Sequence, residues 1–204
     1  MATNLTIEQL SNWSSNPGAL ARFESLVLLT QRTTFVKTVL NLQENPEFIR
    51  GAIQRVLERH KLSCTLPRGR GYVYDQLRLN PEQRYSGSVL LKSLLSAPDF
   101  LLEGEGGKLK VTLLDRMIYT YQRHLGITKT TAAEAAVSFE MFFEIYKGYQ
   151  LAVFELIECP NCAAEFLISC QNTVPRCPLC VAHRHAIPTK MIASNHKHLR
   201  LNVG

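Results

Sequence analysis

The stretch from Cys159 to Cys180, CPNCAAEFLISCQNTVPRCPLC, carries the most specific pattern in this chain of 204 residues. It contains two C-x-x-C pairs, Cys159 with Cys162 and Cys177 with Cys180, separated by fourteen residues. Each pair offers two thiolates from one tight turn, so the four sulfurs can close around a single tetrahedral ion. The stretch therefore predicts a small zinc module with one structural ion per chain.

The residues around the pairs support this interpretation. Pro160 and Pro178 restrict the backbone inside each pair, which limits the entropy lost when the site forms. Residues 163–168 are expected to form a strand that leaves the first pair, with the spacer folding as a short hairpin. Because four thiolates fill all four positions, no position is left for a catalytic water, and the ion is expected to be structural.

Two other uses of the paired cysteines are two disulfides and a dithiol redox site. Disulfides form in oxidising compartments, whereas the N-terminal sequence MATNLTIEQL does not read as a secretory signal. A thioredoxin-type site places one C-x-x-C at the start of a helix within a βαβ unit, which is not predicted here. Zinc is thus favoured, with Cys170 as a bystander thiol and Cys64 as a small apolar side chain.

Helical periodicity dominates the chain before Cys159, so the predicted fold is mainly α. Thr112–Asp115 has the pattern of a capping box and predicts a helix that ends at Gly126. Thr131–Glu134 has the same pattern and predicts a helix of about 25 residues. An aromatic stripe on this second helix is expected to pack in the core, or else to form a groove for a partner protein. Its members are Phe139, Phe142, Phe143, Tyr146 and Tyr149, and Val153 continues the spacing.

A helix-turn-helix-like segment is predicted at about residues 33–60. Residues 19–42 have a helical pattern, and Asn45 followed by Pro46 marks the start of a second, basic helix over 46–60. The pattern fits a DNA-binding motif, but many helical hairpins share it.

Positive charge is concentrated in two segments. The chain has 23 Lys and Arg against 17 Asp and Glu, and its formal net charge is +6. Residues 50–84 hold eight bases and three acids, while residues 166–204 hold five bases and no acid. Such clusters bind polyanions by releasing condensed counterions, although a solvated basic surface explains the charge equally well. The candidate DNA contacts are Arg50, Arg55, Arg59, Arg68, Arg70, Arg176, Arg184 and Lys190.

Composition and missing motifs narrow the class of protein. Hydrophobic residues make up 46% of the chain, enough for a packed core, and no apolar run reaches the roughly 18 residues of a membrane span. We expect a cytoplasmic protein with no membrane partner. Motifs of hydrolases, metalloproteases and dinucleotide-binding enzymes are absent from the sequence, so we expect no enzyme, and an enzyme with a zinc-ribbon accessory ranks last. The predicted division is a helical domain over 1–157, the four-cysteine zinc module over 158–182 and a basic His-rich tail over 183–204.

The order of these motifs resembles the FlhC family, the DNA-binding and zinc-binding half of FlhDC-type bacterial transcription activators. The resemblance is clearest over residues 112–182, where LLDRMIYTYQRHL, AVSFEMFFEIYKGYQLAVFELIECPNCAAEFLIS and CPLC follow the order helix, helix, cysteine pair, strand, cysteine pair. A fainter similarity runs through FVKTVL, the helix over 46–60 and the LPRGRG loop. About half of the chain is covered well. A shorter spacer, the additional Cys170 and the His/Lys/Arg-containing tail depart from the family pattern.

The resemblance implies that the four paired cysteines are zinc ligands and that Arg68 and Arg70 lie in a Pro/Gly loop comparable to the family's. It also implies a promoter-binding activator that forms a hetero-oligomer with a small helical FlhD-like partner and recruits RNA polymerase. Its targets would be flagellar operons, or transfer operons as for the conjugative-element homologues SetC and AcaC. The alternative is a zinc-ribbon protein–protein interaction module without direct DNA binding.

Overall fold

The computed structural model describes residues 17–63, 71–96, 112–169 and 176–182 of the chain. Within these ranges the protein is mainly helical, with four cysteines gathered at the C-terminal end, which confirms the predicted fold class. No described helix has the length and apolar character needed to cross a membrane. The elements are α2 (Pro17–Leu29), α3 (Thr33–Val39), α4 (Pro46–Arg59), η2 (Tyr74–Gln76), α5 (Pro81–Leu95), α6 (Leu113–Thr128), α7 (Phe139–Gln150), β1 (Phe154–Glu158), β2 (Glu165–Ser169) and α8 (Pro178–Ala182).

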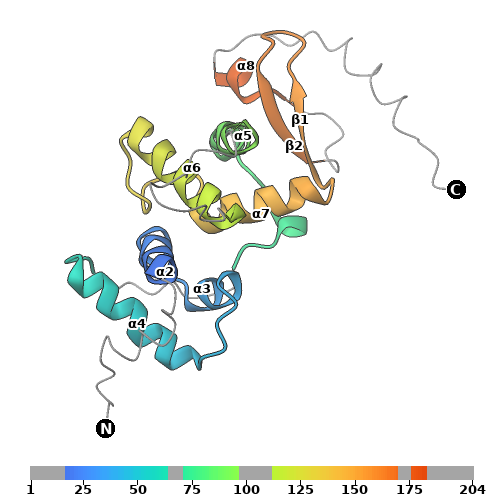
Figure 1. Ribbon diagram of the computed structural model, residues 1–204. Coiled ribbons are helices and arrows are strands. Elements are labelled where there is room, and N and C mark those ends of the chain that lie inside the picture. Colours follow the sequence, from blue (N-terminus) through green and yellow to red (C-terminus); the bar gives the residue numbers. More distant parts are fainter. Residues whose placement is uncertain (1–16, 64–70, 97–111, 170–175, 183–204) are drawn as a thin grey trace, which may run out of the picture.

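The elements form a stack with helices at one end and the cysteine hairpin at the other (Figure 1). Helices α2, α3 and α4 pack together at the first end, while α5 contacts α6, α7, β2 and α8. Helix α4 begins as predicted, because the Asn45 side chain accepts a hydrogen bond from the backbone N–H of Glu47 and Pro46 follows it. Helix α5 is thus the element that joins the helical body to the cysteine end.

The helix predicted over residues 19–42 is broken into α2 and α3. A buried carboxylate, Glu140 on α7, accepts hydrogen bonds from Thr30 Oγ1 at 2.5 Å and from Arg32 Nε at 2.6 Å. Both donors lie in the break between the two helices. The ion pair with Arg32 and the hydrogen bond from Thr30 offset the cost of burying the Glu140 carboxylate. Because Glu140 is distant in the sequence, the periodicity of residues 19–42 does not reveal the break.

Three predicted helix ends are wrong: both ends of α7 and the C-terminal end of α6. The Glu134 carboxylate accepts hydrogen bonds from the backbone N–H and the hydroxyl of Thr131, and the Glu134 N–H donates to the Thr131 carbonyl, so these residues close a turn. Helix α7 begins only at Phe139, after the N-cap Ser138. The helix is 12 residues long, because the chain reverses at Ala152, with φ of 54°, and enters strand β1. At the other helix, α6, the Thr112–Asp115 capping box is confirmed, but the helix continues past Gly126 to Thr128. One glycine within a helix costs only about 1 kcal/mol.

The aromatic stripe belongs to the core, as the favoured interpretation predicted. Phe139 and Phe142 are fully buried, and Phe143, Tyr146 and Tyr149 pack against the same core. Tyr121 of α6 lies edge-on to Phe139, with ring centroids 5.4 Å apart, and donates its hydroxyl to the carbonyl of Val137 at 2.7 Å. The stripe therefore holds α6 and α7 together and is not exposed to a partner.

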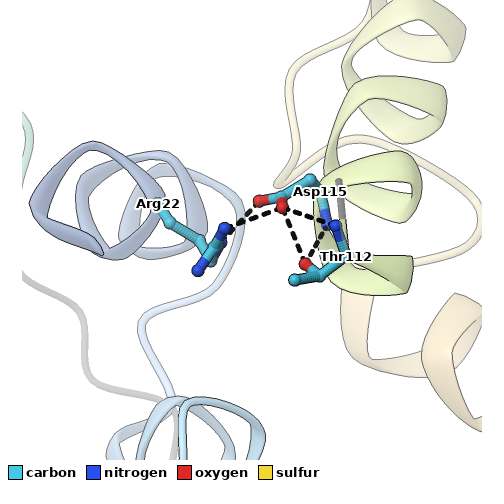
Figure 2. Close-up of polar contacts among 3 residues, drawn as sticks. All are labelled: Arg22, Thr112 and Asp115. Carbon is cyan, nitrogen blue, oxygen red and sulfur yellow. Dashed lines mark hydrogen bonds and ion pairs between the residues drawn. The ribbon is translucent and has the colours of Figure 1, made fainter. Parts of the chain in front are cut away.

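An ion pair also ties the N-terminal helices to α6. Arg22 of α2 donates from Nε and Nη2 to the two carboxylate oxygens of Asp115, at 2.5 and 2.8 Å (Figure 2). The same carboxylate accepts from the backbone and the hydroxyl of Thr112 at the start of α6. Asp115 thus caps α6 and binds α2 at once.

Candidate metal centre

The four paired cysteines meet with the spacing of a tetrahedral metal site. Their Sγ atoms all lie within 4.8 Å of one another. The Sγ atoms of Cys159 and Cys180 are 3.6 Å apart, and those of Cys162 and Cys177 are 3.7 Å apart. Four sulfurs about 2.3 Å from one ion would be about 3.8 Å from each other, whereas a disulfide bond measures about 2.05 Å. The cysteines are therefore free thiols that can hold one metal ion, and the two pairs are not disulfides.

The first cysteine pair forms the turn between the two strands. The backbone N–H of Cys159 donates to Ala164 and the N–H of Ala163 donates to Cys159, both at 2.8 Å. Strands β1 and β2 pair antiparallel on either side, from Phe154 with Ser169 to Glu158 with Glu165. The hairpin therefore surrounds the first pair and is not confined to the spacer, contrary to the prediction. Strand β1 was missed because helical periodicity runs on from α7.

The second pair lies at the start of α8. Pro178 begins this short helix, and the N–H of Val181 donates to the carbonyl of Cys177 at 3.1 Å. The side chain of Asn161, between the first two cysteines, donates to Cys180 Sγ at 3.3 Å. This bond joins the two halves of the site and provides a donor to a thiolate in the second pair.

The thiols differ in how readily they ionise. Burial opposes ionisation of Cys159, but the backbone N–H groups of Asn161 and Cys162 outweigh it and lower its pKa to about 7. Burial raises the pKa of Cys177 to about 12. Four neighbouring thiolates repel one another, so full ionisation of the cluster requires a bound cation. The donor set therefore fits a metal ion, and its affinity should rise with pH.

Apolar side chains cover the site on the hairpin side. Phe166 and Ile168 of β2 lie in one buried cluster with Cys159, Cys177 and Cys180, while Cys162 is exposed. The other face of the strand carries Leu167, which belongs to the main core of the helical body. The hairpin is thus covered on both faces, by the cysteines on one and by the helices on the other.

Helix α5 positions the hairpin through a buried serine that sequence analysis missed. The Ser88 hydroxyl accepts a hydrogen bond from the backbone N–H of Leu167 at 2.7 Å and donates one to the carbonyl of Arg84 at 2.6 Å. Lys92 forms an ion pair with Glu165 at the start of β2. A serine within a helical pattern gives no signal of such a role, since it most often bonds its own helix.

The predicted DNA contacts fall into separate groups. On α4, Arg50 is exposed, Arg55 is half-buried and Arg59 is exposed but paired with Glu24. Arg176 is exposed and directly precedes Cys177. The end of the molecule formed by α8, β1 and β2 lies opposite the end that holds α4 (Figure 1). The remaining four lie outside the described residues: Arg68, Arg70, Arg184 and Lys190.

Comparison of the sequence with protein-family models and with curated proteins found no match. What the site establishes is a four-cysteine centre able to hold a metal ion, built into a mainly helical protein.

Proposed function

We propose that this protein is the DNA-binding subunit of an FlhDC-type bacterial transcriptional activator, stabilised by one zinc ion. The observation that carries the proposal is the four-sulfur cluster, joined through α5 to a helical body with exposed arginines. A small helical FlhD-like partner, promoter DNA and RNA polymerase would complete the assembly, and the protein would act in the cytoplasm. Its own chemistry would be binding, with no catalytic step.

The choice of zinc follows from the donor set. Four thiolates in a tetrahedron suit Zn²⁺, which prefers such closed sites in structural roles. Cys159, Cys162, Cys177 and Cys180 would hold the ion, and its binding free energy, on the order of 10 kcal/mol in small zinc modules, would stabilise the hairpin and α8. Metal analysis of protein purified without added metal should find one zinc per chain.

DNA binding is supported by the basic groups on two parts of the surface. Arg50 and Arg55 lie on the second helix of the helix-turn-helix-like segment, and Arg176 lies beside the cysteine site. Cations in such positions contact phosphates, which orient a protein on DNA without specifying its sequence. Sequence specificity would require contacts to base edges, and the partner subunit would contribute to them.

A gel-shift experiment tests the function. Candidate early flagellar and transfer promoters are mixed with the full chain, with and without the co-expressed partner, at two salt concentrations. A partner-dependent shift that weakens steeply with salt is expected, since each phosphate contact releases counterions. Zinc in the preparation without a shift on any promoter would contradict the proposal.

The second candidate is a zinc-ribbon interaction module that binds protein and not DNA. One observation favours it: a groove between α5 and α6 is lined by the exposed apolar side chains Tyr85, Val89, Tyr119 and Ile127. Replacing Arg50, Arg55, Arg68 and Arg70 together would leave such a protein fully active, whereas a DNA-binding subunit would bind promoters more weakly.

A further inference from the structure

A polar cleft lies between α5, strand β2 and the segment that precedes α5. It has a volume of about 570 Å³ and is lined on one side by residues 74–79 and on the other by Phe154 and residues 167–169, with Arg84 at the start of α5. Two of its lining side chains are arginines, Arg78 and Arg84, and one is an acid, Asp75. No described metal ligand lines it, so the cleft is separate from the cysteine centre.

A third arginine is attached to this cleft. Arg84 Nη1 donates to the backbone carbonyl of Arg176 at 3.0 Å, which places the chain around Arg176 beside the guanidinium. Both Arg78 and Arg176 are exposed. Arg78 and Arg84, which are close together in the sequence, therefore lie near the backbone of Arg176, which is 92 residues beyond Arg84.

The charge balance at this cleft differs from that on α4. Along α4, Glu47 and Glu58 offset Arg50 and Arg55, and Arg59 is paired with Glu24 outside the helix. The residues that line the cleft include two arginines and a single aspartate, and the backbone of a third arginine, Arg176, is bonded to one of them. A concave site in which charges of one sign predominate attracts ions of the opposite sign more strongly than a surface on which positive and negative charges balance.

The cysteine centre holds part of this arrangement in place. Arg176 immediately precedes Cys177, so the position of its carbonyl depends on the second cysteine pair. That carbonyl accepts from Arg84, and the carbonyl of Arg84 in turn accepts from Ser88, which binds β2. A guanidinium fixed at one nitrogen keeps its other N–H groups in a defined orientation, which suits contacts to phosphate oxygens.

We infer that this cleft, and not α4, is the principal seat for the backbone phosphates of duplex DNA. The inference rests on the proposed DNA-binding function and names the surface that performs it. Arg78 and Arg84 contact phosphate oxygens from within the cleft, while Arg176 contributes charge at its rim. A metal ion at the four cysteines then supports DNA binding indirectly, through the carbonyl of Arg176.

The test compares two variants that remove the same charge from the metal-loaded full chain, each co-expressed with the partner. One is R78Q/R84Q in the cleft, and the control is R50Q/R55Q on α4. Binding to a labelled mixed-sequence duplex is followed by fluorescence anisotropy between roughly 50 and 200 mM salt. The logarithmic slope of affinity against salt should fall by about 1.8 for R78Q/R84Q, because each lost phosphate contact removes about 0.9, and by no more than about 0.9 for R50Q/R55Q.

Metal content and far-ultraviolet circular dichroism check that each variant is folded. Should R78Q/R84Q not fold, R78Q alone is measured, and it should lower the slope by about 0.9. A loss of slope in R50Q/R55Q that equals or exceeds the loss in R78Q/R84Q would overturn the inference. So would an unchanged slope in both variants, or failure of the unchanged chain with its partner to bind the duplex while it still shifts promoters.

If the protein binds neither the promoters nor the mixed-sequence duplex, both the proposed function and the inference are wrong. A parallel thermal-denaturation series with inorganic phosphate separates a small-anion site from a DNA site. Stabilisation of the unchanged chain by millimolar phosphate, lost in R78Q, with no binding to the duplex, would overturn the assignment of DNA as the ligand.

Discussion

Ala163 adopts a left-handed backbone conformation, with φ of 56°, directly after the first cysteine pair. An alanine in this region is strained by contact of its Cβ with the backbone, and the hydrogen bonds that close the turn hold it there. One residue therefore sets the path by which the chain leaves the first two sulfurs and enters β2.

Glycine at this position should relieve that strain. We expect Ala163→Gly to raise the free energy of unfolding by about 0.5 kcal/mol, since relief of the strain exceeds the added flexibility of the unfolded chain. Ala163→Val should lower it by more than about 1 kcal/mol. Chemical denaturation of the metal-loaded protein measures both. Ala164→Gly, at a position without positive φ, is the matched control and should be destabilising.

A cysteine substitution tests the metal ligands themselves. Cys177→Ser should abolish metal binding and unfold the hairpin and α8, while most of the helical signal in circular dichroism remains. The serine hydroxyl does not ionise in place of the thiolate, and the other three sulfurs cannot close the site. Cys170→Ser, which the spacing leaves out of the ligand set, is the control and should keep its metal. Unchanged metal content in Cys177→Ser would show that the ligands are assigned wrongly.

Among the elements, helix α7 and strand β1 pack so closely that one position between them admits no side chain. A Cβ on Gly148 would come within 2.7 Å of Phe154 Cε2 and 3.2 Å of Tyr74 Cβ. Gly51 on α4 has no such neighbour within 4 Å. Two glycines in helices thus have opposite roles, one required by packing and the other replaceable.

Alanine at these two positions should therefore have opposite effects. Gly148→Ala should destabilise the protein by about 1–3 kcal/mol, because the ring of Phe154 must move in a packed core. Gly51→Ala should stabilise it by about 1 kcal/mol, because alanine favours the helix. Thermal or denaturant unfolding of both variants provides the comparison, and destabilisation of equal size in both would contradict the described packing.

The contact between α2 and α6 predicts a dependence on pH. Partial burial works against the charge of Asp115, but Arg22 and Thr112 outweigh it and lower the pKa of the carboxyl below its usual value. Its contribution to stability is therefore complete above the ordinary carboxyl pKa and disappears as the pH falls through the lower, folded value.

The variant Asp115→Asn isolates this contribution. It should lower the free energy of unfolding by about 1–2 kcal/mol at neutral pH, because it loses both the charged partner of Arg22 and part of the helix cap. In acid the difference from the unchanged protein should shrink towards zero. Denaturation curves over a pH series test this, and a difference that stays constant into acid would refute the role of the ionised carboxylate.

For the whole molecule, sequence patterns identified the features that depend on local chemistry. The cysteine spacing identified the four sulfurs that meet, and the caps at Asn45 and Thr112 predicted the start of two helices correctly. Such signals need only neighbouring residues. The predicted end of α7 was wrong, because the turn at Ala152 that follows the helix contains no glycine to indicate it in the sequence.

Features that depend on distant residues could not be read from the sequence. Glu140 lies 108 residues from Arg32, and Ser88 lies 79 residues from Leu167, so neither contact has a local pattern. The arginine cleft likewise joins Arg78 and Arg84 to Arg176 only through the fold. The sequence therefore predicted the four cysteines and named Arg176 as a DNA contact, but it did not indicate that Arg78 and Arg84 line a cleft beside the backbone of Arg176.

The central claim is that a zinc-stabilised four-cysteine centre supports DNA binding. The most direct test is to titrate Zn²⁺ into the metal-free full chain, in the presence of its partner, while the anisotropy of a labelled duplex is followed at low salt. The account predicts that DNA affinity rises with added zinc, reaches a plateau at one ion per chain and is lost again when a chelator is added. Equal affinity at every zinc concentration, or no binding at any, would contradict it.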